Sequence, residues 1–185
     1  MSGNIWFTSD SHFNHVNILK FTDWDGVTPI RPGFKDVEHM NETMIENWNK
    51  VVKPQDKIYH LGDISFGREA DFQKIAYRLN GSKRLLLGNH DKFDILVYAE
   101  HFKSIGVTRS FTEFSKPFIC SHYPIQSASV SMSKHERVWN VHGHIHQNTV
   151  CIGDSKHPDP MYVNICVEKT DYTPVHLDDL LARMK

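Results

Sequence analysis

The chain has 185 residues, of which 39% are hydrophobic and 23% are charged, and its formal net charge is −1. This composition indicates a globular chain that can bury a core, and it excludes a broadly disordered one. The near-zero charge argues against non-specific binding to nucleic acid, which needs an excess of Lys and Arg. The length predicts one domain over residues 1–185.

Cysteine usage and the N-terminus bear on where the protein works. Cys120, Cys151 and Cys166 form no CxxC pair, a pattern that favours reduced thiols over a disulfide framework or a zinc knuckle. The opening stretch, MSGNIWFTSD, does not resemble a secretory signal peptide, and no apolar run approaches the ~18 residues of a membrane span. We therefore expect a cytoplasmic protein without membrane contact.

Short apolar runs rich in β-branched and aromatic residues predict strands along the chain. The predicted strands are 5–8, 57–61, 84–88, 118–121, 138–142 and 162–168. Between them, apolar residues at helical spacing predict helices. The predicted helices are 36–52, with Asp36 as N-cap, then 69–81, 91–102 and 177–184. Strands interleaved with helices indicate a layered α/β domain, with long irregular loops at 22–35 and 147–160.

A polar cluster directly follows five of these predicted strands. Ligand sites of open α/β sheets lie beyond the carboxyl ends of the strands, so five such clusters predict one shared site. The clusters supply seven candidate metal ligands: Asp10, His12, Asp63, Asn89, His122, His144 and His146.

Local spacing supports this convergence. Asp10 and His12, like His144 and His146, are separated by one residue, which in extended backbone directs both side chains to one side. Glycines at positions 62, 88 and 143 directly precede candidate ligands, where the chain must turn sharply and approach the site closely.

The types of these side chains indicate which ions would bind. Nitrogen and oxygen donors without a thiolate suit Mn, Fe, Zn, Ni or Mg, with Mn favoured, and disfavour a structural cysteine-type zinc site. A single tetrahedral zinc needs about four ligands, so seven candidates favour two divalent ions about 3.5–4 Å apart with a bridging carboxylate. Such a pair lowers the pKa of a bridging water and stabilises negative charge on phosphoryl oxygens.

The order D-x-H, GD, GNHD, H and GHxH, running from Asp10 to His146, resembles that of the calcineurin-like metallophosphoesterases. The stretch YTPVHLDDL (172–180) is similar to the closing strand and helix of this family, and SDSHFNHVNILKF, MNETMIENWNKVV and IYHLGDISFG resemble a small subgroup from bacteria and their phages. The resemblance implies an α/β fold, a layered α-β-β-α sandwich of two mixed β-sheets flanked by helices, with the metal site at the carboxyl ends of the strands.

The same resemblance implies a role for each candidate. One ion would be held by Asp10, His12 and His146. Asp63 would bridge the two ions, and the second ion would be held by Asn89, His122 and His144. Two residues of the GNHD motif would act on the substrate: His90 as general acid or charge stabiliser beside the phosphate, and Asp91 as the group that orients His90.

Four further side chains have competing interpretations. His15 begins a predicted helix beside the Asp10 loop, where a helix N-terminus favours a phosphate, or it serves in capping and packing. Arg31 either binds a phosphate with two hydrogen bonds or is a solvated charge. His60 and His142 lie inside their predicted strands, and we expect them either to be buried and hydrogen-bonded or to support the metal ligands from behind.

One departure from the family pattern bears on the substrate. Residues 62–68 read GDISFGR, whereas phosphoprotein and dinucleoside tetraphosphate phosphatases of the superfamily usually read GDxxDRG. This favours a small, nucleotide-like phosphodiester, hydrolysed by attack of a metal-bridging hydroxide, over a phosphoprotein. A phosphomonoesterase and a nuclease acting on single-stranded nucleic acid are the alternative enzymes. A non-catalytic binding scaffold is disfavoured because all seven candidate ligands and His90 are present.

Overall fold

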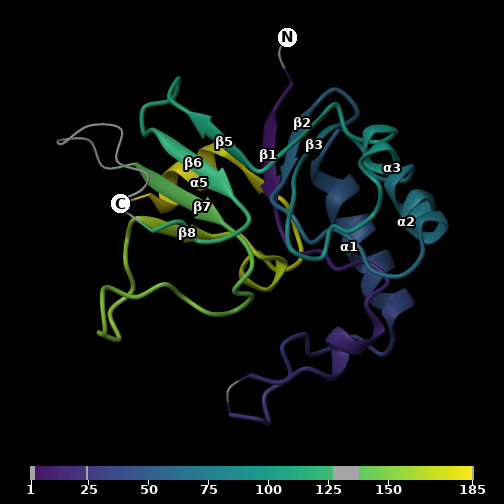
Figure 1. Ribbon diagram of the computed structural model, residues 1–185, viewed down its shortest axis with the longest axis horizontal. Helices are drawn as coiled ribbons and strands as arrows, with labels where there is room; N and C mark the ends of the chain where they lie inside the picture. Colours follow the sequence, from purple (N-terminus) through teal and green to yellow (C-terminus); the bar gives the residue numbers. More distant parts are fainter. Residues whose placement is uncertain (1–2, 24, 127–137, 185) are drawn as a thin grey trace.

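The computed structural model describes residues 3–23, 25–126 and 138–184. Its strands form two sheets, one with the strand order β4-β3-β2-β1-β9 and one with the order β5-β6-β7-β8 (Figure 1). The elements in chain order are β1 (Ile5–Thr8), η1 (Val16–Lys20), α1 (Val37–Val51), β2 (Lys57–His60), α2 (Glu69–Ala76), β3 (Ser82–Leu86), α3 (Ile95–Ala99), β4 (Ser104–Gly106), β5 (Thr108–Phe111), β6 (Phe118–Ser121), β7 (Trp139–His142), β8 (Tyr162–Asn164), η2 (Val167–Lys169), β9 (Val175–His176) and α5 (Leu177–Arg183).

Both sheets are mixed. In the five-stranded sheet β1 to β4 run parallel, and β9 pairs antiparallel with β1. In the four-stranded sheet β5 is antiparallel to β6, while β6, β7 and β8 are parallel. Two mixed sheets with flanking helices confirm the predicted fold class.

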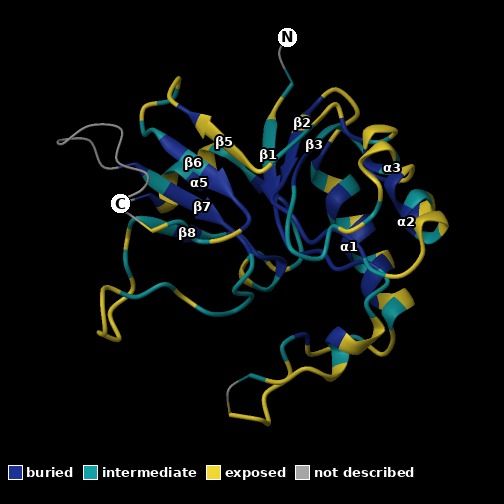
Figure 2. Ribbon diagram, in the orientation of Figure 1, coloured by how far each residue is buried: buried dark blue, intermediate teal, exposed yellow. Residues whose placement is uncertain are grey.

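Two apolar clusters hold these layers together. The first lies between the five-stranded sheet and the helices, where Met44 and Trp48 of α1, four residues apart, pack near Ile58 of β2. The second lies between the sheets and joins Phe7 of β1 to Phe118 of β6, together with residues of α5. The buried stripe of α1 is visible along the side that faces the sheet, and its opposite side is exposed (Figure 2).

The boundaries of several elements differ from the sequence predictions. The strands at 5–8 and 118–121 are as predicted, and α1 begins after Asp36, whose carboxylate accepts a hydrogen bond from the backbone N–H of His39. The helix predicted over 91–102 is only the five-residue α3, because Asp94, three residues after the predicted start, is its N-cap. Within the described residues, no helix is long and apolar enough to cross a membrane.

Candidate metal centre

The seven candidate ligands lie where predicted, at the carboxyl ends of strands from both sheets. Asp10 and His12 follow β1, Asp63 follows β2, and Asn89 follows β3, all in the five-stranded sheet. The other three candidates follow β6 and β7 of the four-stranded sheet: His122, His144 and His146.

Five of the seven candidates have left-handed backbone, namely Asp10 (φ 57°), His12 (48°), Asp63 (55°), His144 (69°) and His146 (49°). A positive φ is uncommon outside glycine, and such conformations gather at functional sites. This corrects the expectation that the two i, i+2 pairs converge through extended backbone. Both pairs lie beyond the ends of their strands, and left-handed turns direct their side chains inward.

The two carboxylate oxygens of Asp10 have different surroundings. Oδ2 accepts hydrogen bonds from the Ser9 hydroxyl, the backbone N–H of His144 and the Cys166 thiol. Oδ1 is buried and has no hydrogen-bond partner among the residues that the structure describes. A buried carboxylate oxygen without a donor is costly unless a cation satisfies it, so Oδ1 fits a metal ligand.

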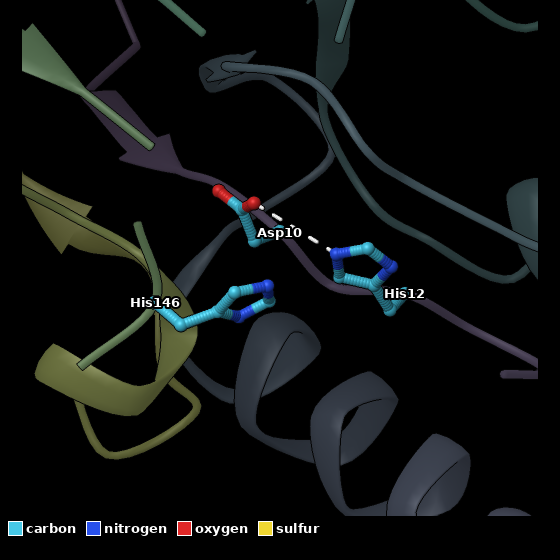
Figure 3. A group of neighbouring side chains, drawn as sticks. All are labelled: Asp10, His12 and His146. Carbon is cyan, nitrogen blue, oxygen red and sulfur yellow. Dashed lines mark ion pairs between the residues drawn. The ribbon is translucent and has the colours of Figure 1, made fainter. Parts of the chain in front are cut away.

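His12 faces this free oxygen. Its Nε2 lies 3.8 Å from Asp10 Oδ1 and 3.6 Å from Asp63 Oδ2. Within residues 3–23, 25–126 and 138–184, neither of its ring nitrogens has a hydrogen-bond partner. Burial lowers the pKa of His12 to about 4, so the ring is neutral at pH 7, the form that binds a metal. Ligand atoms of Asp10, His12 and His146 all lie within 4.8 Å of one another, and the two imidazoles lie close to the carboxylate (Figure 3).

A second group shares Asp10. Ligand atoms of Asp10, Asp63 and His122 also lie within 4.8 Å of one another. Asp63 Oδ2 lies 3.6 Å from His12 Nε2 and 3.5 Å from His122 Nε2. Its Oδ1 is fixed by the backbone N–H of His90, which donates to it at 2.8 Å. One carboxylate oxygen thus lies between an imidazole of each group.

His122 and Asn89 present two ligand atoms to each other. The Nδ1 of His122 lies 2.8 Å from the Leu61 carbonyl and must carry the hydrogen there, which makes Nε2 the ring nitrogen that is available to a cation. This Nε2 lies 2.9 Å from Asn89 Oδ1. Two ligands about 2.1 Å from one ion and at right angles are about 3 Å apart, so this pair fits a shared cation.

His144 is placed less tightly. It belongs to neither of the two close groups, but its ring centroid lies 5.1 Å from that of His122. Burial lowers the pKa of His144, which favours its neutral form. Its ring also contacts Tyr123, at 4.5 Å between centroids, and its backbone N–H holds Asp10 Oδ2.

Glu168 is a site residue that the sequence analysis missed. Its Oε1 lies 2.9 Å from His146 Nδ1 and accepts a 2.8 Å hydrogen bond from Arg31 Nε. Burial opposes charge on His146, but the bond to Glu168 outweighs it and raises the pKa of the ring. The sequence analysis placed Glu168 inside a strand predicted over 162–168. The observed strand, β8, ends at Asn164, so Glu168 follows a strand end as the other candidates do, and this signal was missed.

The two residues of the GNHD motif have separate surroundings. The ring of His90 lies beside Phe66, at 4.7 Å between centroids, and 5.7 Å from the ring of His12. The carboxylate of Asp91 accepts hydrogen bonds from the backbone N–H groups of Asp63, Ile64 and Gly88. Asp91 therefore joins the loops that follow β2 and β3, and these bonds do not orient the His90 ring as expected.

The expected substrate contacts of His15 and Arg31 do not fit their surroundings. Arg31 is 1% exposed, and its guanidinium donates to the carbonyls of Asp10 and Ser11 as well as to Glu168, so it has no surface for a phosphate. His15 precedes only the five-residue η1 and stacks on Phe66 at 3.8 Å between centroids. Burial lowers the pKa of His15 to about 4, so it brings no positive charge at pH 7.

The remaining sequence predictions concern buried histidines and glycines. His60 and His142 are buried and hydrogen-bonded as expected, to the Ser11 hydroxyl and the Gly143 carbonyl. A Cβ at Gly143 would lie 2.2 Å from Asp10 Oδ2, so only glycine allows this close approach.

Comparison with known proteins identifies the family. The profile of the calcineurin-like phosphoesterases matches residues 3–180. The chain belongs to this family. Calcineurin-like phosphoesterases are metal-dependent hydrolases of phosphate esters, in agreement with the buried cluster of nitrogen and oxygen donors.

Relatives of this calcineurin-like phosphoesterase occur in archaea, phages and bacteria. It is 35% identical to an uncharacterized protein of Methanocaldococcus jannaschii over 94% of this chain and 87% of that protein. It is 37% identical to the gene 66 protein of Mycobacterium phage D29, over 48% of this chain and 41% of that protein. A crystal structure of a protein of unknown function from Aquifex aeolicus superposes with a TM-score of 0.71 and 27% identity, over 97% and 98% of the two chains.

Proposed function

We propose that this protein is a binuclear metal-dependent phosphoesterase that hydrolyses a small, nucleotide-like phosphodiester. The position of Asp63 carries the proposal. Its Oδ2 lies 3.6 Å from His12 Nε2 and 3.5 Å from His122 Nε2, which supports a carboxylate shared by two ions.

The ligands divide into two sets around Asp63. Asp10, His12 and His146 would hold one ion. Asn89, His122 and His144 would hold the other, and Mn²⁺ suits both sets of nitrogen and oxygen donors. When bound, two such ions supply an activated water and neutralise charge that develops on the phosphoryl oxygens.

The protein's own groups would then orient the reactants. The backbone N–H of His90 holds Asp63 Oδ1, which leaves Oδ2 for the ions. The His90 ring is half-buried beside Phe66 and next to the site, so it can reach a leaving oxygen or share the charge of the phosphate. Asp91 keeps the two loops that carry Asp63 and His90 in register.

The first experiment measures hydrolysis of bis-p-nitrophenyl phosphate and p-nitrophenyl phosphate with Mn²⁺ after removal of metals by EDTA. We expect turnover that requires Mn²⁺ and is faster with the diester. Faster turnover of the monoester would replace the diesterase with a monoesterase, and salt-sensitive cleavage of single-stranded DNA would favour a nuclease. If no phosphoester is hydrolysed with Mn²⁺ or with the other candidate ions, Fe, Zn, Ni and Mg, the proposal is overturned.

A second experiment tests His90. His90→Ala keeps the backbone N–H that holds Asp63, so we expect two Mn²⁺ ions to bind as in the wild type. Loss of the imidazole should lower kcat by about 10²–10⁴-fold. The matched control is His157→Ala, which removes an exposed imidazole in the loop after β7. Unchanged turnover in His90→Ala would remove His90 from the mechanism.

A further inference from the structure

A buried charge network connects the two sheets beneath the candidate metal centre. Arg31, Glu168 and His146 form it, with side-chain exposures of 0%, 3% and 24%. Burying an ion pair is costly, so such a pair is weak evidence for stability by itself and raises the question of what it positions.

Arg31 holds the first ligand loop by its backbone. One guanidinium nitrogen donates to the Ser11 carbonyl at 2.8 Å, and another donates to the Asp10 carbonyl. The third donor, Nε, lies 2.8 Å from Glu168 Oε1. The planar fork of arginine makes these contacts together, and the ammonium of lysine cannot reproduce the arrangement.

Glu168 carries this connection to the other sheet. Its Oε1 also lies 2.9 Å from Nδ1 of His146, the residue beyond β7. Because Nδ1 is occupied by this contact, Nε2 is the ring nitrogen that remains for a cation. A carboxylate that engages the second nitrogen of a histidine ligand fixes its tautomer and ring direction.

The segment that carries Glu168 is itself fixed beside the site. The backbone N–H of Val167 donates to the Ser9 carbonyl, and the Cys166 thiol donates to Asp10 Oδ2. Glu168 is therefore held relative to Asp10 by its own side chain, through Arg31, and by the two residues that precede it.

We propose that Glu168, held by Arg31, is a positioning residue that directs His146 Nε2 toward the ion shared with Asp10 and His12. This inference rests on the proposed binuclear site. Both residues act through a metal ligand: Glu168 through the His146 ring, and Arg31 through the backbone of the Asp10 loop.

The test measures Mn²⁺ binding to the EDTA-treated full chain by isothermal titration calorimetry and electron paramagnetic resonance. Glu168→Gln removes the charge that engages Nδ1, and Arg31→Lys removes the fork. In each variant we expect the Kd of one of the two ions to rise by about 10–100-fold, while the other ion keeps its affinity. The control is Glu42→Gln, which breaks an exposed Glu–Arg pair with Arg78 and should leave both Kd values unchanged.

Three results would overturn parts of this inference. If the wild type binds no Mn²⁺, the proposed function fails and the positioning role fails with it. If the wild type binds two ions and both variants match it, only the positioning role fails. A parallel loss of both affinities would indicate a general structural role instead. Should Glu168→Gln not fold, Glu168→Asp keeps the negative charge but draws the carboxylate back from the His146 ring, and it must show the same loss of one ion.

Discussion

The two oxygens of Asp10 illustrate how single residues prepare this site. Oδ2 accepts hydrogen bonds from three donors that hold it in place, whereas Oδ1 is buried and no donor in the described part of the chain reaches it. An aspartate that merely satisfied its neighbours would not leave one oxygen unpaired in the interior. The protein therefore fixes the direction of the carboxylate before any ion binds. This reduces the conformational entropy that is lost when an ion binds.

Gly143 makes this fixed direction possible, and its replacement tests the argument. In Gly143→Ala the new Cβ would lie 2.2 Å from Asp10 Oδ2 and 2.1 Å from the Ser9 hydroxyl, so both side chains must move. We expect a loss of about 1–3 kcal/mol in the free energy of unfolding and a rise of at least about tenfold in the Mn²⁺ Kd. Urea unfolding and calorimetric titration measure the two effects.

Gly106→Ala is the control for this prediction. A Cβ at Gly106 would find its nearest neighbour at 3.8 Å, which is ordinary contact, so both quantities should stay close to those of the wild type. Wild-type metal affinity in Gly143→Ala would show that Asp10 is not a ligand in the orientation described.

At the scale of elements, Asp56 connects the start of β1 to the turn that precedes β2. Its carboxylate accepts hydrogen bonds from the backbone N–H groups of Asn4 and Lys53 and from the Trp6 indole. Burial raises the pKa of Asp56, but the hydrogen bonds outweigh burial and hold the pKa below its usual value. The folded state therefore favours the ionised carboxylate.

This gives a prediction with a defined pH dependence. A lowered pKa in the folded state adds stability that is fully present above the unfolded pKa, about 3.9, and disappears as pH falls through the folded value. Asp56→Asn should lower the free energy of unfolding by about 1–3 kcal/mol at pH 7. The amide nitrogen would replace one carboxylate oxygen and cannot accept the hydrogen bonds that this oxygen accepts. Urea unfolding at pH 7, at pH 5 and at roughly pH 3.5 measures the difference in free energy of unfolding between the wild type and Asp56→Asn. This difference should be the same at pH 7 and 5 and smaller at the lowest pH, which lies below the unfolded pKa.

Asp154→Asn, at an exposed loop position, is the control and should unfold like the wild type at each pH. A difference between Asp56→Asn and wild type that grows as pH falls would contradict the assigned direction of the Asp56 pKa.

Helices and strands that depend on local sequence could be predicted, whereas those that depend on distant contacts could not. α1 follows from its helical spacing and from Asp36, and the ligand clusters follow from short strands that end at polar residues. The two-residue β9 is too short for periodicity to predict, and it was expected only because residues 172–180 resemble the closing strand and helix of the family; it pairs with the free edge of β1. The Arg31–Glu168 contact joins residues 137 positions apart, so no local pattern in one sequence could reveal it.

At the scale of the whole molecule, the candidate ligands come from both sheets. Ion binding should therefore stabilise the packing of one sheet on the other, and with it the entire fold. A ligand that binds only the folded state adds about 2.7 kcal/mol when its concentration is 100 times its Kd. For a chain of this size, 1 kcal/mol corresponds to roughly 2–4 °C in Tm.

Because two ions bind, EDTA treatment should remove about twice this stabilisation and lower Tm by about 11–22 °C relative to protein with Mn²⁺ at 100 times the Kd of each ion. Differential scanning calorimetry measures this shift, and it should appear as one transition because the ions hold both sheets. His122→Ala removes one ligand of the four-stranded sheet and should lose part of the Mn²⁺-dependent shift, while His157→Ala should keep all of it. Two separate transitions, with only one of them sensitive to Mn²⁺, would show that the ions do not join the sheets.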